Sequence, residues 1–165
     1  MAKTIKALLQ WTFEIIHAGH VMTFWYAKQF ADELIVALNT NDLIRSYKNR
    51  EPIDTRENKK IVVEAIRYVD KVIPATEESP MQMILDNDID IFIVWDEFVE
   101  KHKNVIKYMK DNWKKVYISP RWKWCISTSA IKEKLLSEAK QNGYIKGECI
   151  DSTIKDETIL WTNEE

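Results

Sequence analysis

Hydrophobic and polar positions alternate along this chain in blocks that predict strands and helices in turn. Short apolar runs bounded by polar residues predict five strands, at residues 5–10, 33–38, 71–73, 89–94 and 115–118. Runs with helical spacing predict helices at residues 19–31, 55–69, 80–87, 99–112 and 127–142. The polar stretch 39–54 connects the second strand to the second of these helices.

This alternation is typical of right-handed βαβ crossovers and predicts an α/β protein of one domain. Its expected architecture is a Rossmann-like, doubly wound parallel sheet with flanking helices. An apolar stripe in the helix at 55–69 is wide enough to pack on such a sheet and consists of Ile61, Val62, Ala65, Ile66 and Val69. Sheets of this type bind ligands beyond the carboxyl ends of their strands, at the topological switch point.

Length and composition fit a globular protein with a sizeable core. The chain has 165 residues, of which 45% are hydrophobic and 30% charged. Its net charge of −2 argues against a general nucleic-acid binder. No apolar run suits a signal peptide or a membrane span, and two distant cysteines fit a reducing compartment. We therefore expect a cytoplasmic protein with no membrane or nucleic-acid partner.

Two histidines one helical turn apart, His17 and His20, follow the first predicted strand at the mouth of the first predicted helix. A helix N-terminus favours phosphate, and paired imidazoles suit a phosphoryl centre whose charge grows during in-line attack. Such a pair also arises by chance, or as half of a metal site. Further metal ligands are few, namely His102, Cys125 and Cys149, without CxxC or HExxH spacing. We predict no metal site in the protein.

Four segments in the same order resemble the cytidylyltransferase family of the HxGH nucleotidyltransferases. They are residues 11–20 (WTFEIIHAGH), 67–73 (RYVDKVI), 93–97 (IVWDE) and 120–129 (PRWKWCISTS). The small glycerol-3-phosphate cytidylyltransferases are the most similar type, and the resemblance covers residues 3–138. It implies a nucleotidyltransferase domain at 1–142 and a C-terminal extension at 143–165.

The resemblance implies roles for individual residues. His17 and His20 match the pair that stabilises the attacked α-phosphate, and Arg67 matches an arginine of the phosphate region. The implied nucleotide-binding residues are Thr12, Phe13, Gly19, Lys48, Asp96, Arg121, Ile126, Ser127 and Thr128. Alternatives stay open for several of them. Ser127 can be only a helix N-cap, Asp96 a turn residue, and Arg67, Lys48 and the nearby Arg50 ordinary solvated side chains.

The implied reaction is direct transfer of CMP. A phosphate oxygen of a small phosphorylated alcohol attacks the α-phosphorus of CTP, pyrophosphate leaves, and Mg²⁺ bridges the triphosphate oxygens. Relatives of this kind are commonly homodimers, so a homodimer is expected. Two other interpretations remain. One is adenylyl transfer from ATP to a sugar phosphate or cofactor precursor, and the other is a non-catalytic nucleotide-fold module.

The chain departs from the family pattern at three glycines, which are replaced by Trp11, Trp95 and Trp124. Bulky rings at these positions would block the cleft, which is the reason for the non-catalytic alternative. The chain has only three glycines but seven tryptophans, although glycine is usually about 7% of residues. We hypothesise that UGA codons meaning glycine underlie several of these tryptophans, with Trp113 as a further example. Milder departures are Glu14 for aspartate and Lys59 for arginine.

Overall fold

The computed structural model describes residues 3–48, 50–122 and 125–142. Its contacts divide the chain into two units, Met1–Ala130 and Ile131–Glu165. The first unit contains the whole sheet. Helix α6 (Thr128–Gln141) begins in the first unit and continues in the second. The predicted C-terminal extension, 143–165, lies outside the described residues.

The first unit is built on five parallel strands in the order β3-β2-β1-β4-β5. The strands are β1 (Lys6–Trp11), β2 (Glu33–Asn39), β3 (Lys71–Ala75), β4 (Ile91–Trp95) and β5 (Lys115–Ser119). All five predicted strands are therefore confirmed, together with the Rossmann-like α/β class. The strand order reverses between β1 and β4, so their carboxyl ends mark the topological switch point.

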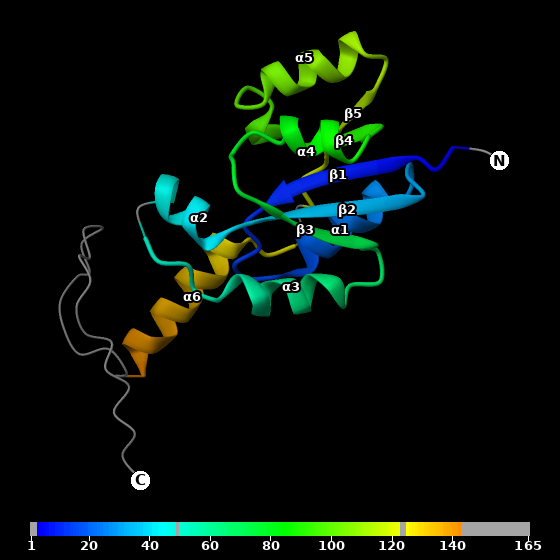
Figure 1. Ribbon diagram of the computed structural model, residues 1–165. Coiled ribbons are helices and arrows are strands. Elements are labelled where there is room, and N and C mark those ends of the chain that lie inside the picture. Colours follow the sequence, from blue (N-terminus) through cyan, green and yellow to red (C-terminus); the bar gives the residue numbers. More distant parts are fainter. Residues whose placement is uncertain (1–2, 49, 123–124, 143–165) are drawn as a thin grey trace. The chain divides into compact units, whose positions relative to one another are not determined.

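Alternate residues of the inner strands pack into two separate apolar cores, one on each face of the sheet. In β1, Ala7 and Leu9 face one core and Leu8 faces the other, because successive side chains of a strand point to opposite faces. Helices α1 (Ala18–Ala27) and α3 (Arg56–Glu64) cover the first face. The second face is covered by α2 (Asn41–Lys48), α4 (Met81–Asp86) and α5 (Lys103–Asp111), as Figure 1 shows for α4 and α5.

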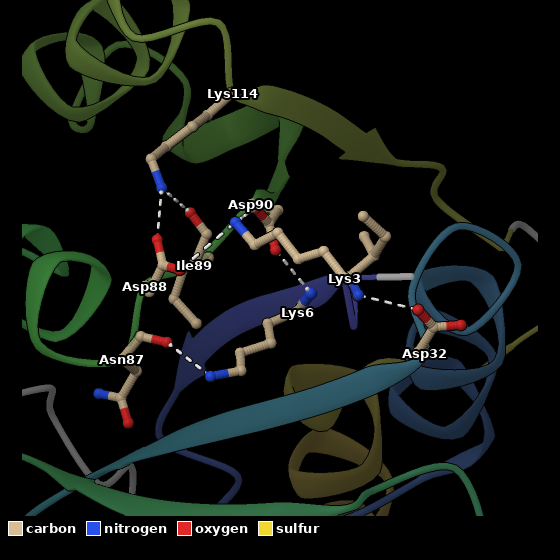
Figure 2. A network of polar contacts seen from close by, with 9 residues as sticks. Lys3, Lys6, Asp32, Asn87, Asp88, Ile89, Asp90 and Lys114 are labelled. Carbon is tan, nitrogen blue, oxygen red and sulfur yellow. Dashed lines mark hydrogen bonds and ion pairs between the residues drawn. The ribbon is translucent and has the colours of Figure 1, made fainter. Parts of the chain in front are cut away.

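A polar network holds the amino ends of β1 and β4 together (Figure 2). The carboxylate of Asp90 accepts a 3.0 Å hydrogen bond from the backbone N–H of Lys6. It also forms an ion pair with the ammonium of Lys3, at 2.7 Å. The Lys114 ammonium donates to the carbonyl of Ile89 at 2.6 Å. These contacts stabilise the amino edge of the sheet, which lies opposite the switch point. The loops that form the site lie at the carboxyl edge.

Several predictions about helices are wrong in detail. The helix predicted at 19–31 ends at Ala27, and the one predicted at 99–112 begins at Lys103. Helix α3 ends at Glu64 with Ala65 as its C-cap, not at Val69, and its buried side chains are Lys59 and Val63. Ile61 and Val62, which the apolar stripe would bury, are 65% and 47% exposed, because the helix turns its 59/63 side toward the sheet. A short helix, α2, also lies inside the polar stretch 39–54.

Candidate active site

The chain leaves β1 through a tight buried turn that leads into α1. Thr12 and Phe13 are both buried, and Phe13 adopts a left-handed backbone conformation with φ of 46°. A positive φ is costly for an aromatic residue and persists only where packing holds it. Here the ring of Phe13 lies between His20 and Phe24, at centroid distances of 5.1 and 5.3 Å. The strained turn therefore links the core to the start of α1.

His17 caps the N-terminus of α1. Its Nδ1 accepts a 3.1 Å hydrogen bond from the backbone N–H of Gly19. Because Nδ1 is the acceptor, the neutral ring carries its proton on Nε2, which is free of this bond and can donate to a ligand. The cap explains the glycine, since a Cβ at position 19 would lie only 3.0 Å from Cε1 of His17. A larger residue would displace the ring.

His17 and His20 form a stacked pair whose centroids are 3.8 Å apart and whose planes differ by 27°. His20 is only 6% exposed, and its Nδ1 has no hydrogen-bond partner among the described residues. Burial lowers the pKa of His20 to about 3, with a smaller contribution from the neighbouring His17. Burial also lowers the pKa of His17. Both rings are therefore neutral hydrogen-bond donors at pH 7 when no anion is bound.

The site has two arms. The first is the loop after β1 together with the start of α1, and the second runs from the end of β4 to the first turn of α6. Ser127 caps this helix, accepting a 3.2 Å hydrogen bond from the backbone N–H of Ala130. Thr128 donates from its hydroxyl to the carbonyl of Ile15 at 3.5 Å, which ties this turn to the loop after β1. Arg121 lies beside Asp96, with 3.4 Å between its Nε and the carboxylate, and also pairs with Glu97.

Both arms line one cleft of about 540 Å³ at the switch point. Seven predicted site residues line it, namely His17, Gly19, His20, Arg121, Ile126, Ser127 and Thr128. The site thus combines two helix N-termini, two neutral imidazoles, two hydroxyls and a guanidinium in one concave surface. Such a set of donors is suited to a chain of phosphates.

The other five predicted site residues do not line the cleft. Thr12 and Phe13 are buried in the turn after β1, and Lys48 lies 3.5 Å from the Thr12 hydroxyl. Asp96 adjoins the cleft through Arg121. Arg67, by contrast, is exposed, lies over the ring of Tyr68, and precedes β3 at the amino edge of the sheet. The structure does not bring Arg67 to the histidines.

Two of the tryptophans at expected glycine positions line the cleft. Trp11 ends β1 and Trp95 ends β4, and their ring centroids are 5.0 Å apart. Because these strands are neighbours at the switch point, the two rings lie side by side in the lining of the cleft, where they also pack against the core. Trp95 also lies 6.5 Å from His20. The third position, Trp124, lies outside the described residues.

The basic residues Arg50 and Lys59 have partners within the protein. Glu14 has a side chain that is only 3% exposed and pairs with Arg50. Lys59 is 2% exposed and donates to the amide oxygen of Asn41 at 3.1 Å. Burial lowers the pKa of Lys59, although the nearby Glu14 acts in the opposite direction. Arg50 and Lys59 thus have acidic or polar neighbours within the protein.

Sequence reasoning missed several residues that line the cleft. These are Thr23, Glu97, Pro120, Trp122, Cys125 and Ser129. A signal existed for Thr23, because it follows His20 by three residues and so lies on the same side of α1. Its hydroxyl is 3.0 Å from that of Ser119, a buried pair that joins α1 to the end of β5.

Within the described ranges, no group of three or more His, Cys, Asp or Glu side chains could hold a metal ion. In the same part of the chain, none of the helices has the length and apolar character needed to cross a bilayer.

The fold and the cleft define a nucleotidyltransferase-like α/β protein. The model of the cytidylyltransferase-like family matches residues 11–134, and the chain belongs to this family. Glycerol-3-phosphate cytidylyltransferase of Bacillus subtilis is 36% identical over 131 residues, which are 79% of this chain and 96% of that enzyme. The family predicted from the four sequence segments is therefore confirmed.

A second relative has a different name. FAD synthase of Thermococcus kodakarensis is 36% identical over 104 residues, 61% of this chain and 69% of that protein. Among solved structures, the lipopolysaccharide core biosynthesis protein of Thermoplasma volcanium has a TM-score of 0.60 at 20% identity, covering 73% of this chain and 99% of that one. This last likeness shows a shared fold.

Proposed function

We infer that this protein transfers CMP from CTP to a small phosphorylated alcohol such as glycerol 3-phosphate, with release of pyrophosphate. The observation that supports it most is the stacked, neutral pair of His17 and His20, which faces Ser127 and Thr128 across one cleft. The similarity to glycerol-3-phosphate cytidylyltransferase extends over nearly all of that enzyme and favours this acceptor.

In the proposed reaction, a phosphate oxygen of the acceptor attacks the α-phosphorus, and the bond from the α-phosphorus to the bridging oxygen breaks. The acceptor needs no general base, because a phosphate monoester is mostly dianionic at neutral pH. CTP enters as its Mg²⁺ complex. The Nε2–H groups of His17 and His20 donate to the α-phosphate oxygens as their charge increases. Arg121 and the first turn of α6 bind the departing pyrophosphate.

Adenylyl transfer is the second candidate, because FAD synthase is 36% identical over 104 residues. The phosphate contacts would be the same for ATP and CTP, so the base and the acceptor distinguish the two reactions. A competition assay with equal CTP and ATP, tested against glycerol 3-phosphate and FMN, measures this directly. Incorporation of CMP into a CDP-alcohol supports our proposal, whereas exclusive AMP transfer to FMN replaces it with the second candidate.

The contact between Trp11 and Trp95 in the lining of the cleft favours a third possibility, a non-catalytic nucleotide-fold module whose cleft these rings partly fill. Pyrophosphate release should therefore be followed for the parent chain and for a Trp11→Gly/Trp95→Gly variant, with CTP, Mg²⁺ and glycerol 3-phosphate. Turnover that appears or rises in the variant identifies a catalytic scaffold that the rings obstruct. If neither chain turns over any common phosphorylated acceptor with CTP or ATP, the enzyme proposal fails.

A further inference from the structure

Helix α5 ends in a Schellman motif with a tryptophan at the position that usually holds glycine. The helix is capped by Asn112, and Trp113 follows with φ of 57°. Its N–H donates to the carbonyl of Lys110 at 3.1 Å, and the N–H of Lys114 donates to the carbonyl of Met109 at 2.8 Å. This pair of bonds requires a left-handed residue between them, for which glycine has no steric penalty.

Helix α4 ends in the same motif and shows what a non-glycine residue needs there. Asp88 has φ of 48°. The equivalent bonds run from the N–H of Asp88 to the carbonyl of Leu85 and from the N–H of Ile89 to the carbonyl of Ile84. Aspartate is among the residues that tolerate this conformation. Figure 2 shows its carboxylate near two lysines, with Lys3 at 3.3 Å and Lys114 at 3.4 Å.

Phe13 is the other described residue with a positive φ, and burial accounts for it. Its side chain is fully buried against Phe24 and His20, so the packing of a large ring offsets the backbone strain. Trp113 has neither kind of compensation. It is 96% exposed, and no ring or cation contact involves it among the described residues. A large aromatic side chain gains nothing at this position, whereas glycine fits the backbone without strain.

Trp11 and Trp95 lead to the same conclusion from space instead of strain. Trp95 has φ of −82°, which any residue adopts, so its backbone alone does not require glycine. Both rings, however, stand at the carboxyl ends of adjacent central strands, where backbone must approach a ligand closely in a sheet of this kind. Position 113, by its backbone, and positions 11 and 95, by their place in the cleft, therefore suit glycine in a chain with three glycines and seven tryptophans.

We propose that positions 11, 95 and 113 are glycine in the protein as its own cell makes it, because the gene carries UGA codons there that the cell translates as glycine. A single reassigned codon accounts for all three sites, whereas separate substitutions would have to place a tryptophan by chance at each. Glycine suits position 113 whatever the activity of the protein, whereas glycine at positions 11 and 95 rests in part on the proposed function. The natural cleft then lacks both of the rings that line it at the switch point.

The gene and the natural protein test this directly. We expect UGA at codons 11, 95 and 113, and peptide masses of the protein purified from its source that contain glycine at these positions. UGG codons, or tryptophan in those peptides, overturn the proposal. Activity separates it from the proposed function. If the codons are UGA but no turnover is found, this inference stands and the proposed function fails. If the codons are UGG and turnover is found, this inference fails and the proposed function stands.

Stability provides a second test on the purified chain. Trp113→Gly should raise the melting temperature by about 2–8 °C, because it removes left-handed strain and loses no contact. The matched control is Trp25→Gly, inside α1, where the ring lies 6.2 Å from that of Trp122. Glycine in a helix interior is destabilising, so this control should melt at a lower temperature. A melting temperature that falls in both variants contradicts the proposal for position 113.

Discussion

The imidazole rings of His17 and His20 stack 3.8 Å apart at the start of α1, and neither is charged at pH 7 in the free protein. This relationship decides how the pair can act. Neutral rings donate one hydrogen bond each, and an arriving phosphate raises their pKa values by its negative charge. In the proposed reaction, the hydrogen bonds that these rings donate strengthen as negative charge accumulates on the α-phosphate oxygens, which is what in-line transfer requires.

Loss of either ring should therefore affect turnover far more than folding. In the Trp11→Gly/Trp95→Gly variant, His17→Ala or His20→Ala is expected to lower kcat by about 10²-fold or more. A loss of this size is typical of removing one hydrogen-bond donor to a developing charge. Pyrophosphate release under saturating CTP measures this. His102→Ala is the control, because His102 is half-buried against Phe92 and does not line the cleft. Equal rate losses in all three variants would contradict the assigned roles.

The low pKa of His20 makes stability depend on pH. Well above pH 6.5 the ring is neutral in both the folded and the unfolded chain, so its protonation does not lower the free energy of unfolding. As the pH falls from 6.5 toward 3, the unfolded chain binds a proton that the folded protein does not. Stability should then decrease by up to about 1.4 kcal/mol per pH unit from this residue.

Urea unfolding at pH 7 and pH 5 checks this dependence. The parent should lose up to about 2 kcal/mol between the two values, with smaller contributions from His17 and His102, whose pKa values are also lowered by burial. His20→Asn should lose clearly less. The same loss in the parent and in His20→Asn would show that His20 is not the group responsible.

Ser127 both caps α6 and lines the cleft, so one substitution should have two effects. Ser127→Ala removes the 3.2 Å bond to the N–H of Ala130 and should cost about 1 kcal/mol of stability. It should also raise the KM for CTP severalfold, since a phosphate ligand is lost. Ser127→Asn keeps the cap without the same hydroxyl and separates the effects. If Ser127→Asn and Ser127→Ala bind CTP as well as the parent, Ser127 is a cap alone.

The Arg67–Asp70 segment resembles a family signature, and its aspartate has a structural role here. The Asp70 carboxylate accepts a 2.6 Å hydrogen bond from the N–H of Leu34 and lies 2.9 Å from the ammonium of Lys28. Asp70→Ala should lower the free energy of unfolding by about 1–2 kcal/mol, because an N–H at the start of β2 loses its partner. Asp86→Ala, on an exposed helix face, is the control. Equal stability of the two variants would contradict this role.

The fold was largely predictable because its strands alternate with helices and the inner strands are almost purely apolar. The cleft was predictable for a topological reason, since residues that follow β1 and β4 must meet at the switch point. Helix α2 was missed because only Leu43 and Ile44 are buried in a polar stretch. Its signals were Thr40, which caps it through the N–H of Leu43, and Asp42 in its first turn.

Other predictions failed where the sequence pattern does not contain orientation. The apolar residues Ile61 and Val62 looked like a buried face, but Val63 and Lys59 occupy it instead. A buried lysine contradicts hydrophobic patterning and depends on its bond to Asn41. Arg67 was expected near the phosphates from resemblance alone. Its position just before β3 places it at the amino edge, which follows from the direction of the strand.

The central claim is that the α-phosphate of a nucleotide lies between the histidine pair and the first turn of α6. A crystal structure of the Trp11→Gly/Trp95→Gly variant with Mg²⁺ and a non-hydrolysable CTP analogue tests it most directly. We predict α-phosphate oxygens within about 2.7–3.2 Å of the Nε2 atoms of His17 and His20, with the outer phosphates at Ser127 and Thr128. A nucleotide bound elsewhere, or one whose phosphates point away from both histidines, would contradict the claim.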